Sequence, residues 1–102
     1  MIAARSFANQ DVGVFGLARS GVSAAKALVA GGARLLAWDD GEASRAALSP
    51  AEAAVIPWRE WPWAALKALV LSPGVPLTHP RPHEIVLHAK AAGVKIIGEE
   101  EF

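Results

Sequence analysis

The sequence predicts a doubly wound α/β fold in which helices cover both faces of a five-stranded parallel sheet. Short apolar runs alternate along the chain with segments of helical periodicity, which is typical of a parallel sheet. The runs at 12–15 and 68–71 are apolar at every position, as expected of strands that are buried on both faces. Right-handed crossovers and a reversal of direction after the third strand predict the strand order 3-2-1-4-5.

Length and composition predict a single domain spanning residues 1–102. Of the 102 residues, 53% are hydrophobic and none is cysteine, which excludes disulfides and cysteine-held metals. Ten basic residues balance ten acidic ones, so we expect neither a nucleic-acid partner nor a membrane partner. No apolar run suits a signal peptide or a membrane span, and we expect a cytoplasmic protein.

The first part of the chain predicts a strand, a helix and a second strand. Residues 12–15 predict the first strand, and apolar residues at helical spacing predict a helix over 20–30. The glycines at 31–32 end that helix, because glycine adopts the left-handed cap conformation without a steric cost. Residues 34–38 predict the second strand, and residues 39–41 turn the chain out of it.

The middle of the chain carries weaker signals. Residues 42–48 predict a short helix. The segment 49–52 has the spacing of a capping box, with proline at the first helical position, and predicts a further helical turn. A short third strand is predicted at 54–56. Residues 58–63 are expected to be irregular, with one turn over 62–67.

The last part of the chain again predicts a strand, a helix and a strand. Residues 68–71 form the predicted fourth strand, which Ser72-Pro73-Gly74 closes. A proline-containing loop leads to a helix predicted over 83–92, and residues 94–97 predict the fifth strand. The acidic segment 99–102 predicts the start of another helix.

A glycine-containing loop between the first strand and the first helix carries the main functional signal. It spans residues 16–21 and reads Gly-Leu-Ala-Arg-Ser-Gly. Backbone amides at this positive end of the helix can bind a phosphate. Gly16 permits the tight turn, and Gly21 permits a close approach of helix to sheet. A dinucleotide fingerprint has a third glycine where this chain has Ala18, so a diphosphate in another position is favoured over NAD or FAD.

Asp39 ends the second strand at the carboxyl edge of the sheet, about 20 residues beyond the glycine loop. An acidic side chain at this place accepts hydrogen bonds from a ribose or a base in nucleotide-binding folds. The loop and Asp39 together predict nucleotide binding. The alternative is that the loop is only a tight turn, and that Asp39 only braces the Asp40-Gly41 turn.

Three sequence motifs together carry a resemblance to a known family. They are Gly-Leu-Ala-Arg-Ser-Gly at 16–21, Trp-Asp-Asp at 38–40, and Leu-Ser-Pro-Gly-Val-Pro at 71–76 followed by His-Pro at 79–80. With these motifs the chain resembles the N-terminal domain of the Mur ligase family, in particular the D-glutamate-adding ligases of peptidoglycan synthesis. The resemblance implies a Rossmann-like domain that binds the uridine diphosphate (UDP) part of UDP-N-acetylmuramoyl-L-alanine.

The resemblance also implies which residues contact the ligand. The glycine loop would lie along the uridine and diphosphate, the turn after the second strand would read the uracil edge, and a third loop would close the opposite side. In chain order these residues are Leu17, Arg19, Ser20, Asp39, Asp40, Gly41, Ser72, Pro73 and Gly74. The family commonly has threonine or arginine after its first acidic residue. This chain has Asp40 and Gly41 there, so no residue is assigned to stacking on the base.

The chemistry of the family needs parts that this sequence lacks. Mur ligases use ATP to make an acyl phosphate, with a phosphate loop ending in Gly-Lys-Ser/Thr, Mg²⁺ ligands and a modified lysine. No such loop occurs in the sequence. The resemblance therefore implies an excised domain, inactive alone and without catalytic residues. Central and C-terminal domains of a longer chain would supply the ATP and Mg²⁺ sites of an amide-bond-forming ligase.

Two other functions remain open. The chain could be a free-standing NAD- or FAD-binding domain, although Ala18 and the lack of a catalytic base count against it. It could also be an interaction domain that has lost ligand binding.

Aromatic and histidine side chains give no firm site. Trp58, Trp61 and Trp63 are expected to cover a core edge, with a stacking platform as the alternative. His83 and His88 are five residues apart, whereas a helical zinc pair needs four. We expect these two to be solvated or capping residues, and we predict no metal site.

Overall fold

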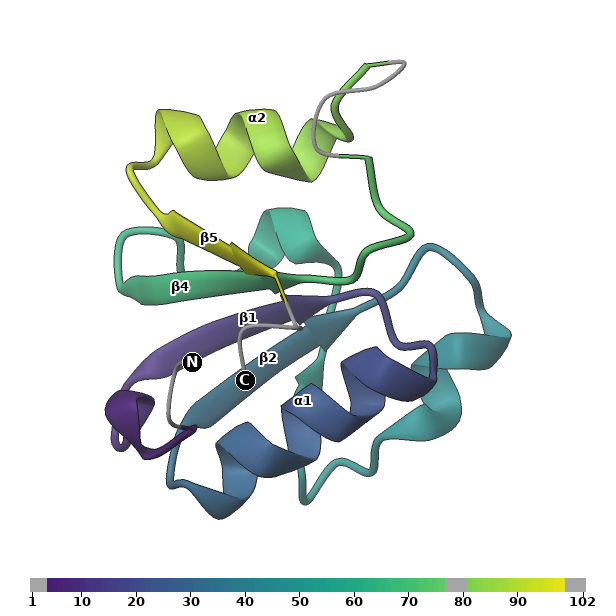
Figure 1. The fold of residues 1–102 in the computed structure, drawn as a ribbon, viewed down its shortest axis with the longest axis vertical. Helices are drawn as coiled ribbons and strands as arrows, with labels where there is room; N and C mark the ends of the chain where they lie inside the picture. The colour runs from purple at the N-terminus through teal and green to yellow at the C-terminus, as the bar shows by residue number, and fades with distance from the viewer. Residues whose placement is uncertain (1–3, 77–80, 99–102) are drawn as a thin grey trace.

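The computed structural model describes residues 4–76 and 81–98, and it confirms the predicted fold class. Within these residues five parallel strands form one sheet in the order β3-β2-β1-β4-β5 (Figure 1). The strands are β1 (Asp11–Phe15), β2 (Arg34–Trp38), β3 (Ala54–Val55), β4 (Leu66–Leu71) and β5 (Lys95–Gly98). The helices are α1 (Arg19–Ala30) and α2 (Glu84–Ala91), and shorter 3-10 turns are η1 (Ala4–Phe7), η2 (Ala43–Ala47) and η3 (Trp58–Glu60).

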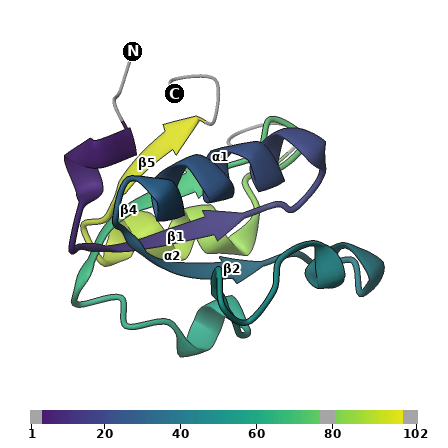
Figure 2. The same cartoon turned by 90° about the horizontal axis from the view of Figure 1, so that it is seen from below.

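Two apolar cores lie on the two faces of the sheet. Helix α1 covers one face, and α2 and η3 cover the other (Figures 1 and 2). Alternate residues of β4 enter the two cores, since Ala68 and Val70 pack on the α1 side whereas Leu69 and Leu71 pack on the α2 side. The central strands are therefore buried on both faces, as their continuous apolar sequences predict.

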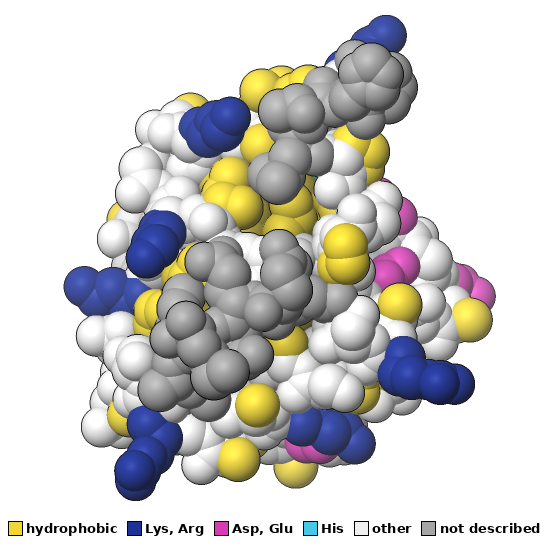
Figure 3. Space-filling view, viewed as in Figure 1, with side chains coloured by type: hydrophobic (Ala, Val, Ile, Leu, Met, Phe, Trp, Pro, Cys, Tyr) yellow, Lys and Arg dark blue, Asp and Glu magenta, His cyan; other side chains and the backbone are white. Residues whose placement is uncertain are grey.

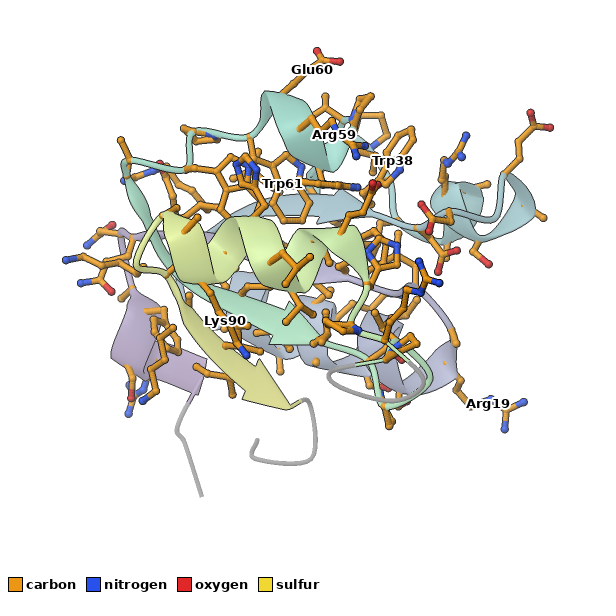
Figure 4. All side chains as sticks on the ribbon, turned by 90° about the horizontal axis from the view of Figure 1, so that it is seen from above. Arg19, Trp38, Arg59, Glu60, Trp61 and Lys90 are labelled. Carbon is orange, nitrogen blue, oxygen red and sulfur yellow. The ribbon has the colours of Figure 1, made fainter. Side chains whose placement is uncertain are left out.

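A glycine inside β1 makes room for a tryptophan of the second core. A Cβ atom at Gly13 would lie 2.3 Å from Cζ3 of Trp61, so the indole ring occupies the space of the missing side chain. Figure 4 shows Trp61 turned inward beneath η3, while Glu60 points outward. Glycine normally weakens a strand, but at this position it allows the large ring of Trp61 to pack closely against β1.

The tryptophan cluster is part of the core. Trp58, Trp61 and Trp63 are all buried, and two of them donate their indole hydrogens to backbone oxygens. Nε1 of Trp61 lies 3.0 Å from the oxygen of Ile56, and Nε1 of Trp63 lies 2.8 Å from that of Trp58. The packing interpretation is therefore confirmed, and the rings are not a surface platform.

Several boundaries differ from the predictions. Segment 42–48 forms the 3-10 turn η2, and segment 49–52 forms only a turn, because the chain becomes extended again at Ala54. In that turn the backbone amide of Ser49 donates to the Glu52 carboxylate at 3.0 Å, and this bond lowers the pKa of Glu52. Strand β4 starts two residues before its predicted start, so the turn opened by Pro62 ends at Leu66.

Segment 58–63 was expected to be irregular, but its first three residues form the 3-10 turn η3. The remaining elements agree closely with their predictions. Strand β3 has two residues where three were predicted, and β5 is shifted by one residue. Helix α2 begins after its N-cap residue, His83. The predicted helix start at 99–102 lies outside the described residues. In the described part of the chain no helix is both long and apolar enough to cross a membrane.

Candidate functional site

Three loops meet at the carboxyl edge of the sheet, where the chain leaves β1, β2 and β4. The amide of Gly16, after β1, donates to the oxygen of Trp38 at the end of β2, at 3.0 Å. The amide of Ser72, after β4, donates to the oxygen of Phe15 at the end of β1, at 3.1 Å. The structure thus brings the predicted segments 16–21, 39–41 and 72–74 to one edge. In open α/β sheets this edge, where the strand order reverses, is the usual place for a ligand.

The backbone conformation and the space at position 16 favour glycine. Its φ angle is +101°, in the region that side chains rarely adopt, and its Cβ would lie 2.4 Å from Cβ of Ser72. The tight turn predicted for Gly16 is therefore present, and the turn also lets the β4 loop close against the β1 loop.

Asp39 joins the glycine loop to the loop after β2. Its Oδ2 accepts a hydrogen bond from the amide of Leu17 at 2.6 Å, and its Oδ1 accepts one from the amide of Gly41 at 2.7 Å. The bracing role considered as an alternative is thus present, and it extends to the glycine loop as well. Each carboxylate oxygen keeps a second lone pair. Contact between Asp39 and a ligand stays a prediction.

The predicted residues of the glycine loop lie in different surroundings. The side chain of Leu17 is buried in the core beneath α1, and its amide already donates to Asp39. Arg19 and Ser20, in the first turn of α1, are exposed. The Arg19 side chain extends away from the body of the protein (Figure 4). Contact of Leu17 with a ligand through its side chain would thus require the core to open.

Helix α1 begins without a side-chain cap. Its N-cap residue, Ala18, is extended (φ −74°, ψ −179°), and its side chain has no group that could accept from the first-turn amides. The first turn contains no acidic residue either. The positive end of the helix dipole thus lies next to the glycine loop, where an anion is favoured.

Arg45, which sequence reasoning missed, supports the loop after β2. Its Nε donates to the backbone oxygen of Asp39 at 2.8 Å, and its Nη2 donates to that of Asp40 at 3.1 Å. Its guanidinium carbon lies 4.0 Å from the centre of the Trp38 ring, a cation–π contact. No periodicity relates these residues, so the sequence held no signal for this support.

His83, at the N-terminus of α2, makes two polar contacts. Its Nδ1 accepts from the amide of Ile85 at 3.0 Å, which confirms the capping interpretation. Its Nε2 lies 2.9 Å from Oδ2 of Asp40, in the loop after β2. Because 43 residues separate His83 from Asp40, the sequence could not indicate this second contact. His88, by contrast, packs against the ring of Trp63, with centroids 4.7 Å apart.

Other surface features add little to the site. An open pocket of about 360 Å³ lies beside β3, lined by Arg45, Leu48, Pro50, Ala53, Ala54 and Val55. Within residues 4–76 and 81–98, no three His, Asp or Glu side chains are grouped to hold a metal ion. On the visible face, Lys and Arg are spread as separate groups (Figure 3). An anionic ligand on this face would thus meet separate local groups and no continuous basic surface.

Comparison with known proteins identifies relatives of the whole chain. No protein-family model matches it. All 102 residues align with UDP-N-acetylmuramoylalanine–D-glutamate ligases, at 48% identity in Caulobacter vibrioides, 52% in Mesorhizobium japonicum and 50% in Brucella abortus. The chain spans 22% of the length of each of these relatives.

A solved structure supports the fold alone. Shikimate dehydrogenase from Aquifex aeolicus superposes with a TM-score of 0.66 over 95% of this chain and 46% of its own, at 17% identity. This likeness agrees with a Rossmann-type sheet and carries no evidence on function. The sequence identities are the stronger finding. By these identities the chain is similar over its whole length to the N-terminal region of the UDP-N-acetylmuramoylalanine–D-glutamate ligases.

Proposed function

We propose that the chain is the substrate-binding domain of a cytoplasmic, ATP-dependent ligase that joins D-glutamate to UDP-N-acetylmuramoyl-L-alanine. In this proposal the UDP part of the substrate binds at the carboxyl edge of β1, β2 and β4. One observation carries it: Asp39 ties the amide of Leu17 to that of Gly41 and so makes one frame of two loops. This frame lies beside the uncapped end of α1, where a diphosphate is favoured.

The frame suits a nucleoside diphosphate in its chemistry. The first-turn amides of α1 would face the diphosphate, and the turn 39–41 would face the uracil edge. The loop 72–74 would form the opposite wall, since Ser72 contacts Gly16 directly. Ala18 is an exposed residue of the glycine loop, and its small side chain leaves access to the helix end.

We infer that ATP and Mg²⁺ bind outside this chain. The sequence contains no phosphate loop with lysine, and the described residues include no cluster of metal ligands. If the proposal is correct, the remaining domains of the ligase hold ATP and Mg²⁺ and perform the chemistry. We expect the isolated chain to release no phosphate from ATP above a buffer blank.

Calorimetric titration of the 102-residue chain with UDP, UDP-N-acetylmuramoyl-L-alanine and NAD tests the proposal. We expect both uridine ligands to bind more tightly than NAD, with a Kd of roughly 10 μM to 1 mM, because the other substrate contacts belong to other domains. Tighter binding of NAD would contradict the proposal and favour a dinucleotide-binding domain. No binding of any of the three would favour the interaction-domain alternative.

Substitution of Ala18 tests the diphosphate position directly. Asp at this extended N-cap position should cap α1 and stabilise the fold by about 0.5–2 kcal/mol. The same carboxylate should repel the diphosphate, so Ala18→Asp should weaken UDP binding at least about tenfold. Ala18→Ser is the matched control, because serine also caps the helix without adding a charge. Equal affinity of parent and Ala18→Asp would show that the diphosphate binds elsewhere.

A further inference from the structure

The three loops of the candidate site are joined pairwise, and His83 makes the last of these joints. Asp39 joins the β1 and β2 loops, and the contact of Ser72 with Gly16 joins the β1 and β4 loops. The segment after β4 reaches His83, whose amide donates to the oxygen of Pro76 at 3.0 Å. The His83 side chain then contacts Asp40 in the β2 loop. The three joints close a ring around the carboxyl end of β1.

The two contacts of the His83 ring favour one tautomer. Nδ1 of His83 accepts from the amide of Ile85, so the proton of the neutral ring lies on Nε2. That proton points to Oδ2 of Asp40, 2.9 Å away. The neutral imidazole therefore satisfies both contacts at once, one to its own helix and one to the β2 loop.

The His83 side chain is held in place before it meets Asp40. The cap bond fixes its orientation, the ring centroid of Phe15 lies 4.8 Å from its own, and only 22% of the side chain is exposed. An exposed ion pair usually gains little, because ordering two long side chains offsets the attraction. Here His83 is already ordered. The entropic cost of forming the contact therefore falls mainly on the side chain of Asp40, which is 65% exposed.

We infer that His83 is a positioning residue of the nucleotide site. It holds Asp40, and with it the turn 39–41, in one conformation before the ligand arrives. Arg45 holds the backbone oxygens of the same turn, so His83 and Arg45 restrain it through different atoms. This inference rests on the proposed function for its ligand, whereas the restraint on the turn can be measured without any ligand.

His83→Asn separates the two contacts of the residue. Asparagine is among the best N-cap residues and can accept from the Ile85 amide, but its shorter side chain does not reach Asp40. We expect this variant to melt close to the parent and to show faster hydrogen exchange at the Gly41 amide. If the turn is correctly formed only part of the time, UDP affinity should fall about 3- to 10-fold.

Companion variants test the same contact from its other side. Asp40→Ala should reproduce the effects of His83→Asn, and the double variant should be no worse than either single one. His83→Ala should lower the melting temperature as well, because it removes the cap. His88→Asn, an equivalent change elsewhere on α2, should leave the exchange of Gly41 unchanged.

The outcomes distinguish this inference from the proposed function. Parental Gly41 exchange and parental UDP affinity in both His83→Asn and Asp40→Ala would overturn the inference, since His83 would then only cap α2. If the parent does not bind UDP, the proposed function fails. The exchange of Gly41 in the two variants still decides whether His83 positions the turn.

Discussion

At the scale of single residues, Asp39 connects two loops. It accepts from the amides of Leu17 and Gly41, which belong to loops at the ends of neighbouring strands. Hydrogen bonds to a charged group contribute about 1.5–3 kcal/mol when buried, and a partly exposed group contributes less. This dual role changes what a mutation here is expected to do: fold and ligand binding should both respond.

Asp39→Ala should lower both stability and affinity for UDP. We expect a loss of about 1–2 kcal/mol in the free energy of unfolding, or roughly 4–8 °C in melting temperature for each kcal/mol. UDP affinity should fall at least about tenfold, because both loops lose their common restraint. Glu42→Ala removes an exposed carboxylate three residues further along the chain and should stay within about 0.5 kcal/mol of the parent. Equal effects of the two substitutions would show that only net charge matters.

Gly16→Ala should destabilise the fold through backbone strain and a steric clash. A side chain at φ +101° costs about 1–3 kcal/mol, and the added Cβ would displace Ser72. We expect a loss of at least about 2 kcal/mol, measured by urea unfolding. Gly74→Ala is the matched control, because a Cβ there meets no atom within 4 Å. An unchanged midpoint for Gly16→Ala would mean that the turn relaxes freely.

At the scale of elements, β1 and η3 fit together through Gly13 and Trp61. Gly13→Ala alone should cost about 1–3 kcal/mol, because the added methyl overlaps the indole ring. Trp61→Leu alone should also destabilise, since it leaves a cavity. The double variant should lose less than the sum of the single losses, because the smaller leucine leaves room for the methyl. Strict additivity, measured by urea unfolding, would show that the two sites do not share this space.

Gly21 tests the approach of α1 to the sheet. It is buried in the first turn of the helix, next to the candidate diphosphate position. Gly21→Val should destabilise the fold by about 1–3 kcal/mol through overpacking. Ser23→Val introduces the same side chain at an exposed position of α1 and serves as the control. A melting temperature equal to that of the control would show that Gly21 has no packing role.

Much of the element level could be predicted from the sequence. The apolar runs of β1 and β4 predicted the buried centre of the sheet, because such runs have few other stable arrangements. The region 42–67 was less predictable, since its turns depend on contacts with distant residues. Gly13 illustrates the limit: its meaning depends on Trp61, and no local periodicity relates the two.

The candidate site could be predicted only in part, because some of its residues are related by a local sequence pattern and others only by the tertiary fold. Gly16 and Asp39 belong to a local strand–turn–helix pattern with a known physical purpose, so the sequence indicated them. Arg45 and His83 act through backbone oxygens and a side chain brought close only by the tertiary fold. Sequence spacing carries no information on such contacts.

At the scale of the whole molecule, one sheet separates two cores, and both should unfold together. Leu28 lies fully buried in the core beneath α1, whereas the three clustered tryptophans lie in the other. Leu28→Ala should cost about 2–5 kcal/mol. We expect circular dichroism and tryptophan fluorescence to report the same lowered midpoint in urea. Leu28→Val is a milder variant if the first is too unstable, and separate midpoints for the two signals would contradict this expectation.

The frame made by Asp39 has a consequence for protein engineering. The groups that hold the loops are backbone amides and one carboxylate, while Ala18 and Arg19 project outward without supporting the frame. A combinatorial library at these two positions could therefore retune which phosphorylated compounds are accepted, with little loss of expression or thermal tolerance. Positions 16 and 39 would not accept such randomisation, because changes there would collapse the scaffold that presents the varied side chains.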